Sequence, residues 1–154
     1  MTKLELDVIG VVRGGRSEPI RDNWGSVRAV IELDRAKVRP RALVGLEEFS
    51  HIEVIYQFHR VPLGTVVEGS RHPRDRADLP DVGIYAQRGR NRPNRLGVTV
   101  CNLVAIDGLS VVVEGLDAID DTPVLDIKPY ISGFAPRGDV REPAWAKEVM
   151  GRYW

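Results

Sequence analysis

The sequence predicts a mainly β protein, a small closed or nearly closed barrel of about seven strands with one or two short helices. Short segments alternate apolar and polar residues, which is typical of strands that bury one face. Turn residues such as the dipeptide Asp107-Gly108 separate these segments, and few stretches repeat apolar residues at helical spacing. With 154 residues, of which 43% are hydrophobic, the chain is long enough for one domain with a core and too short for two. We therefore expect residues 1–154 to form a single barrel domain.

The N-terminal part is predicted to contain two strands and one short helix. In residues 4–13, apolar side chains alternate with acidic ones at the start, which indicates a half-buried strand. Residues 14–26 are dense in turn residues and predict a loop that Trp24 anchors. A second strand follows at 27–33. A proline then stands where a helix can begin, and apolar residues at helical spacing predict a short helix over 40–49.

The middle of the chain is predicted to alternate strands with long polar loops. Residues 51–59 alternate again and place His59 on the polar face near the end of a strand. Residues 60–81 contain three prolines and no periodicity, which predicts a long loop, and loops of that length are often functional. A short strand at 82–87 leads into a second polar loop, and 98–106 is the strand that leaves it.

The C-terminal part is predicted to add two extended segments and a helix. Asp107-Gly108 is a strong hairpin signal that leads into a strand at 109–115. Prolines flank the extended segment 122–131, and each withholds a backbone donor, which favours an edge or irregular strand. A proline near the start of residues 142–152 predicts a short helix there.

Composition limits the classes of function. Lys plus Arg and Asp plus Glu are equal at 22 each, so any attraction to nucleic acid has to come from local clustering. The single cysteine, Cys101, excludes an intramolecular disulfide, and its position in mid-strand favours a core residue over a nucleophile. The histidines have no metal-ligand spacing, so we expect no metal site. The N-terminus lacks a secretory apolar run and no stretch approaches membrane-spanning length, so we expect a cytoplasmic protein.

Residues 87–97 form a loop made of anion-binding groups. The segment reads Gln-Arg-Gly-Arg-Asn-Arg-Pro-Asn-Arg-Leu-Gly and lies between two predicted strands. Its guanidinium forks and side-chain amides suit phosphate or carboxylate recognition, its proline stiffens the backbone, and its glycines allow close approach to a ligand. Composition alone leaves a solvated basic turn as the alternative.

A second polar segment follows Asp121. In an extended chain Asp126, Lys128 and Tyr130 share one face, so a carboxylate, an ammonium and a phenol point the same way and can form the wall of a polar site. The alternative is an internal ion pair between Asp126 and Lys128 on a wet face, with Tyr130 packing as a lid. His59, on pattern alone, is favoured as a hydrogen-bonded structural histidine over an acid or base.

Three groups of residues together resemble one known family. They are the loop 88–97 followed by Val98-Thr99, the segment 121–130 that reads Asp-Thr-Pro-Val-Leu-Asp-Ile-Lys-Pro-Tyr, and Phe49-Ser50-His51-Ile52 with Phe58-His59. They look like the TsaA/TrmO-type family of S-adenosylmethionine-dependent tRNA methyltransferases. The resemblance extends over residues 7–131, and the Thr-Pro-Val-Leu-Asp-Ile-Lys-Pro-Tyr motif is its specific part.

The resemblance implies a small β-barrel that works as a homodimer and holds S-adenosylmethionine near the loop 88–97. The family methylates the exocyclic nitrogen of threonylcarbamoyladenosine beside the tRNA anticodon. Carried over residue by residue, the implied cofactor-binding residues are His59, Arg88, Arg92, Pro93, Asn94, Leu96, Gly97, Asp126, Ile127 and Tyr130. The implied catalytic residues are Asp126, Lys128 and Tyr130.

Methyl transfer needs an aligned donor and acceptor and the removal of a proton from the acceptor nitrogen. Arg92 could bind the methionine carboxylate or a substrate anion. Asp126 is the first candidate for orienting the acceptor or taking its proton, with Lys128 holding it ionised. Tyr130 could stack on a base or fix the cofactor.

The chain departs from the family pattern at two prolines. The family loop usually reads Arg-Ser-Pro and then Arg-Pro-Asn-Pro, whereas this chain has Arg90 and Arg95 at those prolines, so we expect a less rigid and more basic loop. Longer bacterial members carry a C-terminal domain that helps bind tRNA, and the added arginines could replace its phosphate contacts or clamp a small anion. Two alternatives to tRNA methylation are therefore methyl transfer to a small molecule and a non-catalytic RNA-binding barrel that uses the arginines at 71–76 and 88–95.

Overall fold

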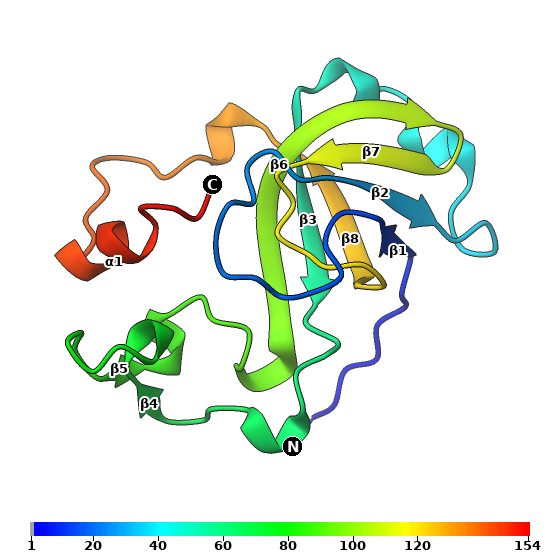
Figure 1. Cartoon of the computed structure of the whole chain (residues 1–154). Helices are drawn as coiled ribbons and strands as arrows, with labels where there is room; N and C mark the ends of the chain where they lie inside the picture. Colours follow the sequence, from blue (N-terminus) through cyan, green and yellow to red (C-terminus); the bar gives the residue numbers. More distant parts are fainter. Residues whose placement is uncertain (1) are drawn as a thin grey trace.

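The computed structural model describes residues 2–154 and contains a closed antiparallel barrel of six strands (Figure 1). The barrel strands are β1 (Gly10–Arg13), β2 (Arg28–Leu33), β3 (His51–Gln57), β6 (Leu96–Asp107), β7 (Ser110–Glu114) and β8 (Pro123–Pro129). Their order around the barrel is β1-β2-β7-β6-β3-β8, and β1 pairs with both β2 and β8, which closes the sheet. The predicted mainly β barrel is therefore confirmed, with six barrel strands in place of about seven.

Short elements complete the fold. Strands β4 (Ser70–Arg71) and β5 (Val82–Gly83) form a separate two-stranded sheet, and α1 (Ala144–Val149) is a single short α-helix near the C-terminus. The 3-10 turns are η1 (Pro40–Leu43), η2 (Leu46–Glu48), η3 (Leu63–Thr65), η4 (Pro73–Asp75), η5 (Ile84–Ala86), η6 (Pro93–Arg95) and η7 (Ser132–Phe134). Within residues 2–154, no helix combines the length and the apolar character that crossing a bilayer requires.

The barrel interior is the hydrophobic core, and the period-two pattern of the strands builds it. In β3 the side chains of Ile52, Val54 and Tyr56 point inward and are at most 1% exposed. Inward residues of the neighbouring strands pack against them. Cys101 is among these buried residues, as predicted, and burial raises the pKa of its thiol to about 12. Its role as a core residue is consistent with that protonated state.

The predicted strand over residues 4–13 is wrong in its first half. β1 begins only at Gly10, and Leu4 and Leu6 are 81% and 58% exposed. Gly10 pairs with Leu33, the last residue of β2, so residues before Gly10 have no β2 partner. Ile9 still bonds to Val124 of β8, but residues 4–8, where the alternation also predicted a strand, pair with no strand of the barrel.

Two further elements differ from their predictions. Of the strand predicted at 82–87, only Val82–Gly83 is extended, and it pairs with β4 outside the barrel. The chain then enters the turn η5 at Ile84, whose side chain is 1% exposed. The helix predicted at 40–49 is two separate 3-10 turns, because Gly45 between them adopts a left-handed φ of 90°. The C-terminal helix is confirmed but shorter than the predicted 142–152.

One end of the barrel collects most of the long connections. β1, β3 and β7 end there, and their antiparallel neighbours β2, β6 and β8 begin there. The connections 14–27, 58–95 and 115–122 all leave this end. We call it the loop end, and we call residues 58–95 the excursion. In Figure 1 the excursion lies to one side below the barrel and carries β4 and β5.

A single carboxylate joins several segments at the loop end. The Tyr56 hydroxyl donates to Asp117 Oδ1 at 2.9 Å, and the hydroxyls of Thr99 and Tyr153 also donate to the Asp117 carboxylate. Burial, together with the Asp117 charge, raises the pKa of Tyr56 and of Tyr153, so both phenols remain protonated donors. The backbone N–H of Trp24 donates to the Tyr153 carbonyl at 2.8 Å. Trp24 is 3% exposed, which confirms the prediction that it anchors the loop 14–26.

Substituting Gly97→Ala is expected to destabilise the barrel. A β-carbon at Gly97 would lie 2.6 Å from ring atoms of Tyr56 and 3.0 Å from the Phe58 ring, and Tyr56 is too buried to move aside. Overpacking of this kind costs about 1–3 kcal/mol of unfolding free energy. Urea unfolding measures it, with Gly83→Ala as the control because a β-carbon there meets nothing within 4 Å. Equal unfolding free energies for the two variants would contradict the close packing of Tyr56 and Phe58 against Gly97.

Candidate functional site

Residues 88–97, which we call the arginine loop, contain four arginines, of which Arg88, Arg92 and Arg95 donate to backbone carbonyls. Arg88 Nη2 donates to the Val98 carbonyl at 2.9 Å, and Arg92 Nη1 donates to the Gln87 carbonyl at 2.6 Å. A guanidinium has several N–H donors, so these bonds leave most of them free for a ligand. Among residues 2–154, no carboxylate forms an ion pair with Arg88, Arg90, Arg92 or Arg95. The loop therefore presents positioned positive charge that the described chain does not neutralise.

The turn at Pro93 gives the loop a specific backbone shape. Pro93 opens η6, after which Asn94 and Arg95 adopt left-handed φ values of 63° and 51°. Asparagine tolerates this region, but a proline, with φ fixed at about −65°, cannot adopt it. Arg95, which stands where the family pattern has a proline, therefore permits a turn that the usual pattern excludes. The Phe58 N–H donates to the Arg95 carbonyl at 2.8 Å and ties the turn to the end of β3.

His59 lies beside this turn and is half-buried. Burial lowers the pKa of His59, the Arg60 charge lowers it further, and the Asp121 carboxylate opposes the shift. The imidazole is consequently neutral near pH 7. Arg60 in turn donates to the Ser17 carbonyl at 2.8 Å, which brings the connection 14–27 to the same place.

Sequence reasoning missed these neighbours of His59. Asp121 forms an ion pair with Arg13 at the end of β1, and the Asp120 N–H donates to the Arg16 carbonyl at 2.7 Å. The density of turn residues in 14–26 and the pair Asp120-Asp121 were visible in the sequence. Only the strand order shows that both segments belong to the loop end.

The segment Asp126 to Tyr130 extends away from the loop end. On β8, Asp126 pairs with Ile55 and Lys128 pairs with Glu53, while the Tyr130 N–H donates to the His51 carbonyl at 3.0 Å. At about 3.4 Å per strand residue, Asp126 lies about 7 Å along the barrel from the end of β3, and Tyr130 lies about 20 Å away. Along the barrel, Asp126 and Ile127 therefore lie closer to the loop end than Lys128 and Tyr130 do.

Asp126 and Lys128 form an internal ion pair, which the sequence analysis gave as the alternative to the wall of a polar site. Lys128 Nζ lies 3.3 Å from Asp126 Oδ2, and the two side chains are 59% and 48% exposed. An ion pair with that exposure contributes little to stability and leaves both groups accessible to a ligand.

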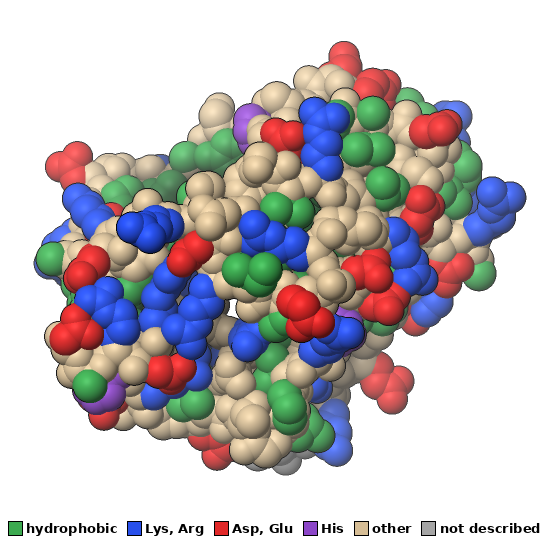
Figure 2. Space-filling model, in the orientation of Figure 1, with side chains coloured by type: hydrophobic (Ala, Val, Ile, Leu, Met, Phe, Trp, Pro, Cys, Tyr) green, Lys and Arg blue, Asp and Glu red, His purple; other side chains and the backbone are tan. Residues whose placement is uncertain are grey.

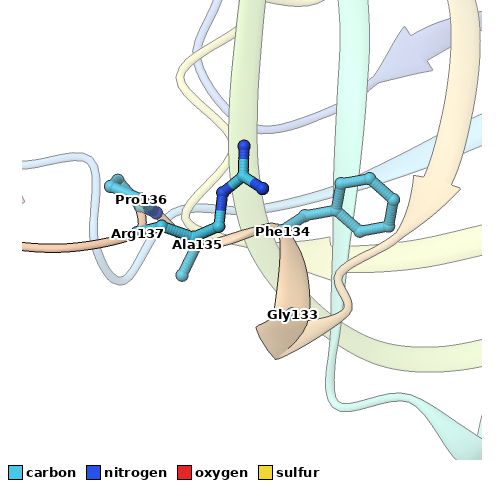
Figure 3. A pocket seen from close by; sticks show the side chains of 5 residues that line it. All are labelled: Gly133, Phe134, Ala135, Pro136 and Arg137. Carbon is cyan, nitrogen blue, oxygen red and sulfur yellow. The ribbon is translucent and has the colours of Figure 1, made fainter.

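Two hollows on the surface lie away from the arginine loop. Asp126, Ile127 and Pro129 of β8 face a groove of about 510 Å³. Its other walls are Ile9, Leu33 of β2, and the turns η1 and η2 with the residues beside them. A smaller hollow of about 360 Å³ is formed by Gly133, Ala135 and their neighbours after β8, where the Phe134 side chain projects from the turn and is 85% exposed (Figure 3). The smaller hollow contains none of the predicted site residues. Within residues 2–154, no three His, Cys, Asp or Glu side chains are grouped as metal ligands.

Fold and loop together define a small antiparallel β-barrel with an uncompensated basic loop at one end. A family model described as the tRNA-methyltransferase O N-terminal domain matches residues 17–135, and the chain belongs to this family. The family resemblance seen in the sequence is therefore confirmed.

Individual relatives agree with this assignment. A probable S-adenosyl-L-methionine-binding protein of Pyrococcus abyssi is 41% identical over 143 residues, which cover 86% of this chain and 71% of the relative. The mouse tRNA (adenine(37)-N6)-methyltransferase is 39% identical over 93 residues, which cover 60% of this chain and 21% of that protein. The crystal structure of TrmO from Pseudomonas aeruginosa superposes with a TM-score of 0.73 at 27% identity and covers 91% of this chain and 62% of the solved one. The chain thus spans about a fifth of the mouse relative and three-fifths of the solved chain.

The pKa of His59 is expected to lie below 6.5 and to respond to its charged neighbours. Substituting Arg60→Gln removes a nearby positive charge and should raise this pKa, whereas Asp121→Asn removes a negative one and should lower it further. NMR titration of the imidazole resonances measures both changes, with His51 and His72 as internal controls. An unchanged His59 titration in both variants would refute the proposed environment.

Proposed function

We propose that this domain binds S-adenosylmethionine at its loop end and transfers the methyl group to the exocyclic nitrogen of threonylcarbamoyladenosine in tRNA. The observation that carries the proposal is the uncompensated arginine loop in a barrel of the tRNA-methyltransferase O family. The Pyrococcus relative is named for S-adenosyl-L-methionine binding, and the mouse relative is named as a tRNA (adenine(37)-N6)-methyltransferase. Those names support the cofactor and the class of acceptor, and a tRNA acceptor implies a cytoplasmic protein.

The residues of the loop end fit the chemistry of this cofactor. Its methionine carboxylate requires a cation, and Arg88 and Arg92 each retain free N–H donors after bonding to the backbone. Its adenosine requires polar backbone groups beside apolar surface, which the turn from Pro93 to Leu96 offers, with Leu96 39% exposed. When bound, the cofactor supplies a methyl group on a positively charged sulfur. The role of the loop is to hold that group in line with an acceptor.

Asp126 is the proposed residue that orients the acceptor or takes its proton. It is the one carboxylate among the predicted site residues, and its side chain is 48% exposed and accessible to a ligand. Lys128, at 3.3 Å, holds the Asp126 carboxylate in place. Proton removal by a positioned group of this kind contributes about 10²- to 10⁴-fold to rate.

We also propose a homodimer, which would bring Tyr130 closer to a loop. Leu96, Val98 and Val100 alternate along the outer face of β6 and are 39%, 37% and 39% exposed, forming an apolar stripe where a solvated barrel would carry polar residues. If two subunits packed on this stripe about an axis perpendicular to the strands, the loop end of one would lie near the Tyr130 end of the other. Light scattering tests the dimer directly, and a mass of one subunit would reject it.

Cells that lack this protein are expected to lose methylated threonylcarbamoyladenosine and retain the unmethylated nucleoside. Mass analysis of tRNA nucleosides measures this. Supplying Arg92→Ala should fail to restore the methylated nucleoside because the loop loses a free cation, while the control Arg41→Ala, an exposed residue on η1, should restore it. If the methylated nucleoside persisted in cells without the protein, threonylcarbamoyladenosine would be rejected as the acceptor. Cofactor binding in calorimetry would then favour a small-molecule acceptor.

Substituting Asp126→Asn is expected to lower kcat by about a hundredfold or more at saturating cofactor, since the amide cannot accept the proton. Single-turnover methyl transfer to purified tRNA measures the change, and calorimetry checks that cofactor affinity is kept. Asp139→Asn, on the exposed segment after η7, is the matched control. If the Asp126→Asn variant transferred methyl groups at the wild-type rate, Asp126 would not be the residue that accepts the proton.

A further inference from the structure

The excursion is a braced unit with its own small core. β4 pairs with β5, and the Asn91 side chain donates to Thr65 Oγ1 at 2.9 Å. The Gln87 side-chain amide donates to the carbonyls of Arg71 and Val82, both at 2.9 Å. Leu79 and Ile84 are 6% and 1% exposed inside it. Side chains on its surface are therefore held in fixed relative positions, as recognition of an extended ligand requires.

The arginines of the run 71–76 have different roles in the structure. Arg74 forms a forked pair with Asp22, with bonds of 3.1 and 2.7 Å, and Arg76 pairs with Asp78 at 2.5 Å and with Glu148 at 2.9 Å. These two cations brace the excursion against the rest of the chain. Their charge is neutralised within the protein, so they offer little to an anionic partner.

Arg71 differs from both. Its Nε is buried and has no hydrogen-bond acceptor, and no carboxylate of residues 2–154 lies within ion-pair distance of its guanidinium. The guanidinium packs against the arginine loop, because a β-carbon at Gly89 would lie 2.6 Å from Arg71 Nη2. A buried donor without an acceptor is costly, and a guanidinium without a counterion favours binding an anion. Arg71 thus adds a further cation to the loop 88–97.

The result is a local concentration of positive charge in a chain whose net charge is zero. Arg71 lies against Gly89 and so adds its charge to the loop that carries Arg88, Arg90 and Arg92. The acidic residues Glu68 and Asp81 of the excursion form no ion pair with any of these arginines. Figure 2 shows Lys and Arg side chains gathered over the part of the molecule that carries β4 and β5, with acidic side chains among them. Such a cluster attracts a polyanion more strongly than a single charge.

An exposed aromatic ring stands beside these cations. Tyr85, on η5, is 75% exposed, and the Arg92 guanidinium lies 6.0 Å from the centre of its ring. Aromatic rings interleaved with arginines form stacking platforms for unpaired bases, whose phosphates the arginines then contact. A small carboxylate or phosphate ligand would use the cations but would have no use for the ring.

We propose that the excursion binds a single-stranded segment of RNA, with Arg71 and Arg90 contacting phosphates and Tyr85 stacking on a base. The identity of that RNA as tRNA rests on the proposed function, whereas the binding surface does not. The arginines at 74 and 76 are excluded from this surface by their internal ion pairs.

Salt dependence of binding tests the phosphate contacts. The probes are a short single-stranded RNA and unfractionated tRNA, followed by fluorescence anisotropy over a range of salt concentrations. Arg71→Gln should make the slope of log affinity against log salt shallower by about 0.7, the change expected for one lost phosphate contact. Arg71→Lys keeps the charge and should keep the slope while losing affinity through the lost fork. Arg76→Gln is the matched control and should keep the wild-type slope.

The base-stacking part has its own pair of variants. Tyr85→Ala should weaken RNA binding by about five- to a hundredfold without changing the salt slope, and Tyr85→Phe should bind as the wild type does. Thermal unfolding checks that all variants remain folded. The proposal is overturned if Arg71→Gln and Tyr85→Ala bind RNA as the wild type does, or if the wild type binds no RNA. It is also overturned if Arg71→Gln loses S-adenosylmethionine in calorimetry and keeps RNA, since Arg71 would then serve the cofactor carboxylate.

Failure of this inference and failure of the proposed function give different results. RNA binding that depends on Arg71 and Tyr85, without methyl transfer, would reject the enzyme and retain the surface. Methyl transfer to tRNA with unchanged RNA affinity in both variants would retain the enzyme and reject the surface.

Discussion

The Asp117 carboxylate is the contact on which the loop end depends. It accepts hydrogen bonds from hydroxyls of β3, β6 and the C-terminal segment, and the raised pKa values of Tyr56 and Tyr153 keep those hydroxyls as donors. Tyr56 is thereby fixed over Gly97, where no larger residue fits. The start of β6 and the end of β3 are held together at this point, and the excursion leaves and returns between them. A carboxylate shared by several hydroxyls therefore sets the position of the arginine loop.

The barrel core was predictable because its signal is local. Alternation in β3 assigns Ile52, Val54 and Tyr56 to one face regardless of which strands lie beside it. The first half of the predicted strand 4–13 failed because a strand also requires a partner, and β2 ends opposite Gly10. The prediction at 82–87 failed for a different reason: the chain turns at Ile84, which is buried, and Tyr85 after it is exposed.

The candidate site was predictable only within each segment. Residues of the loop 88–97 lie together because they are contiguous, whereas the distance from the loop to Tyr130 depends on the register of β8 against β3. No local pattern contains that register. Asp121 and Ser17 became neighbours of the site through the strand order, which sequence reasoning about single segments does not provide. The ion pair of Asp126 with Lys128 was foreseen as an alternative because both residues lie on one strand face.

In the sequence, the run 71–76 and the loop 88–95 look like equivalent clusters of arginines. In the structure they differ, because Arg74 and Arg76 pair with carboxylates and, among the described residues, the arginines of the loop do not. The carboxylates that neutralise Arg74 and Arg76 come from Asp22, Asp78 and Glu148, two of which are distant in sequence. Arg71 has no carboxylate partner within residues 2–154, and its guanidinium lies against Gly89 of the arginine loop. The two proposals assign adjacent tasks to this one connection: its returning turn at Pro93 to Gly97 would hold the cofactor, and its outward face would bind RNA. Since both belong to one braced unit, binding of RNA at Arg71 and Tyr85 would position the acceptor beside the turn without any movement of the barrel.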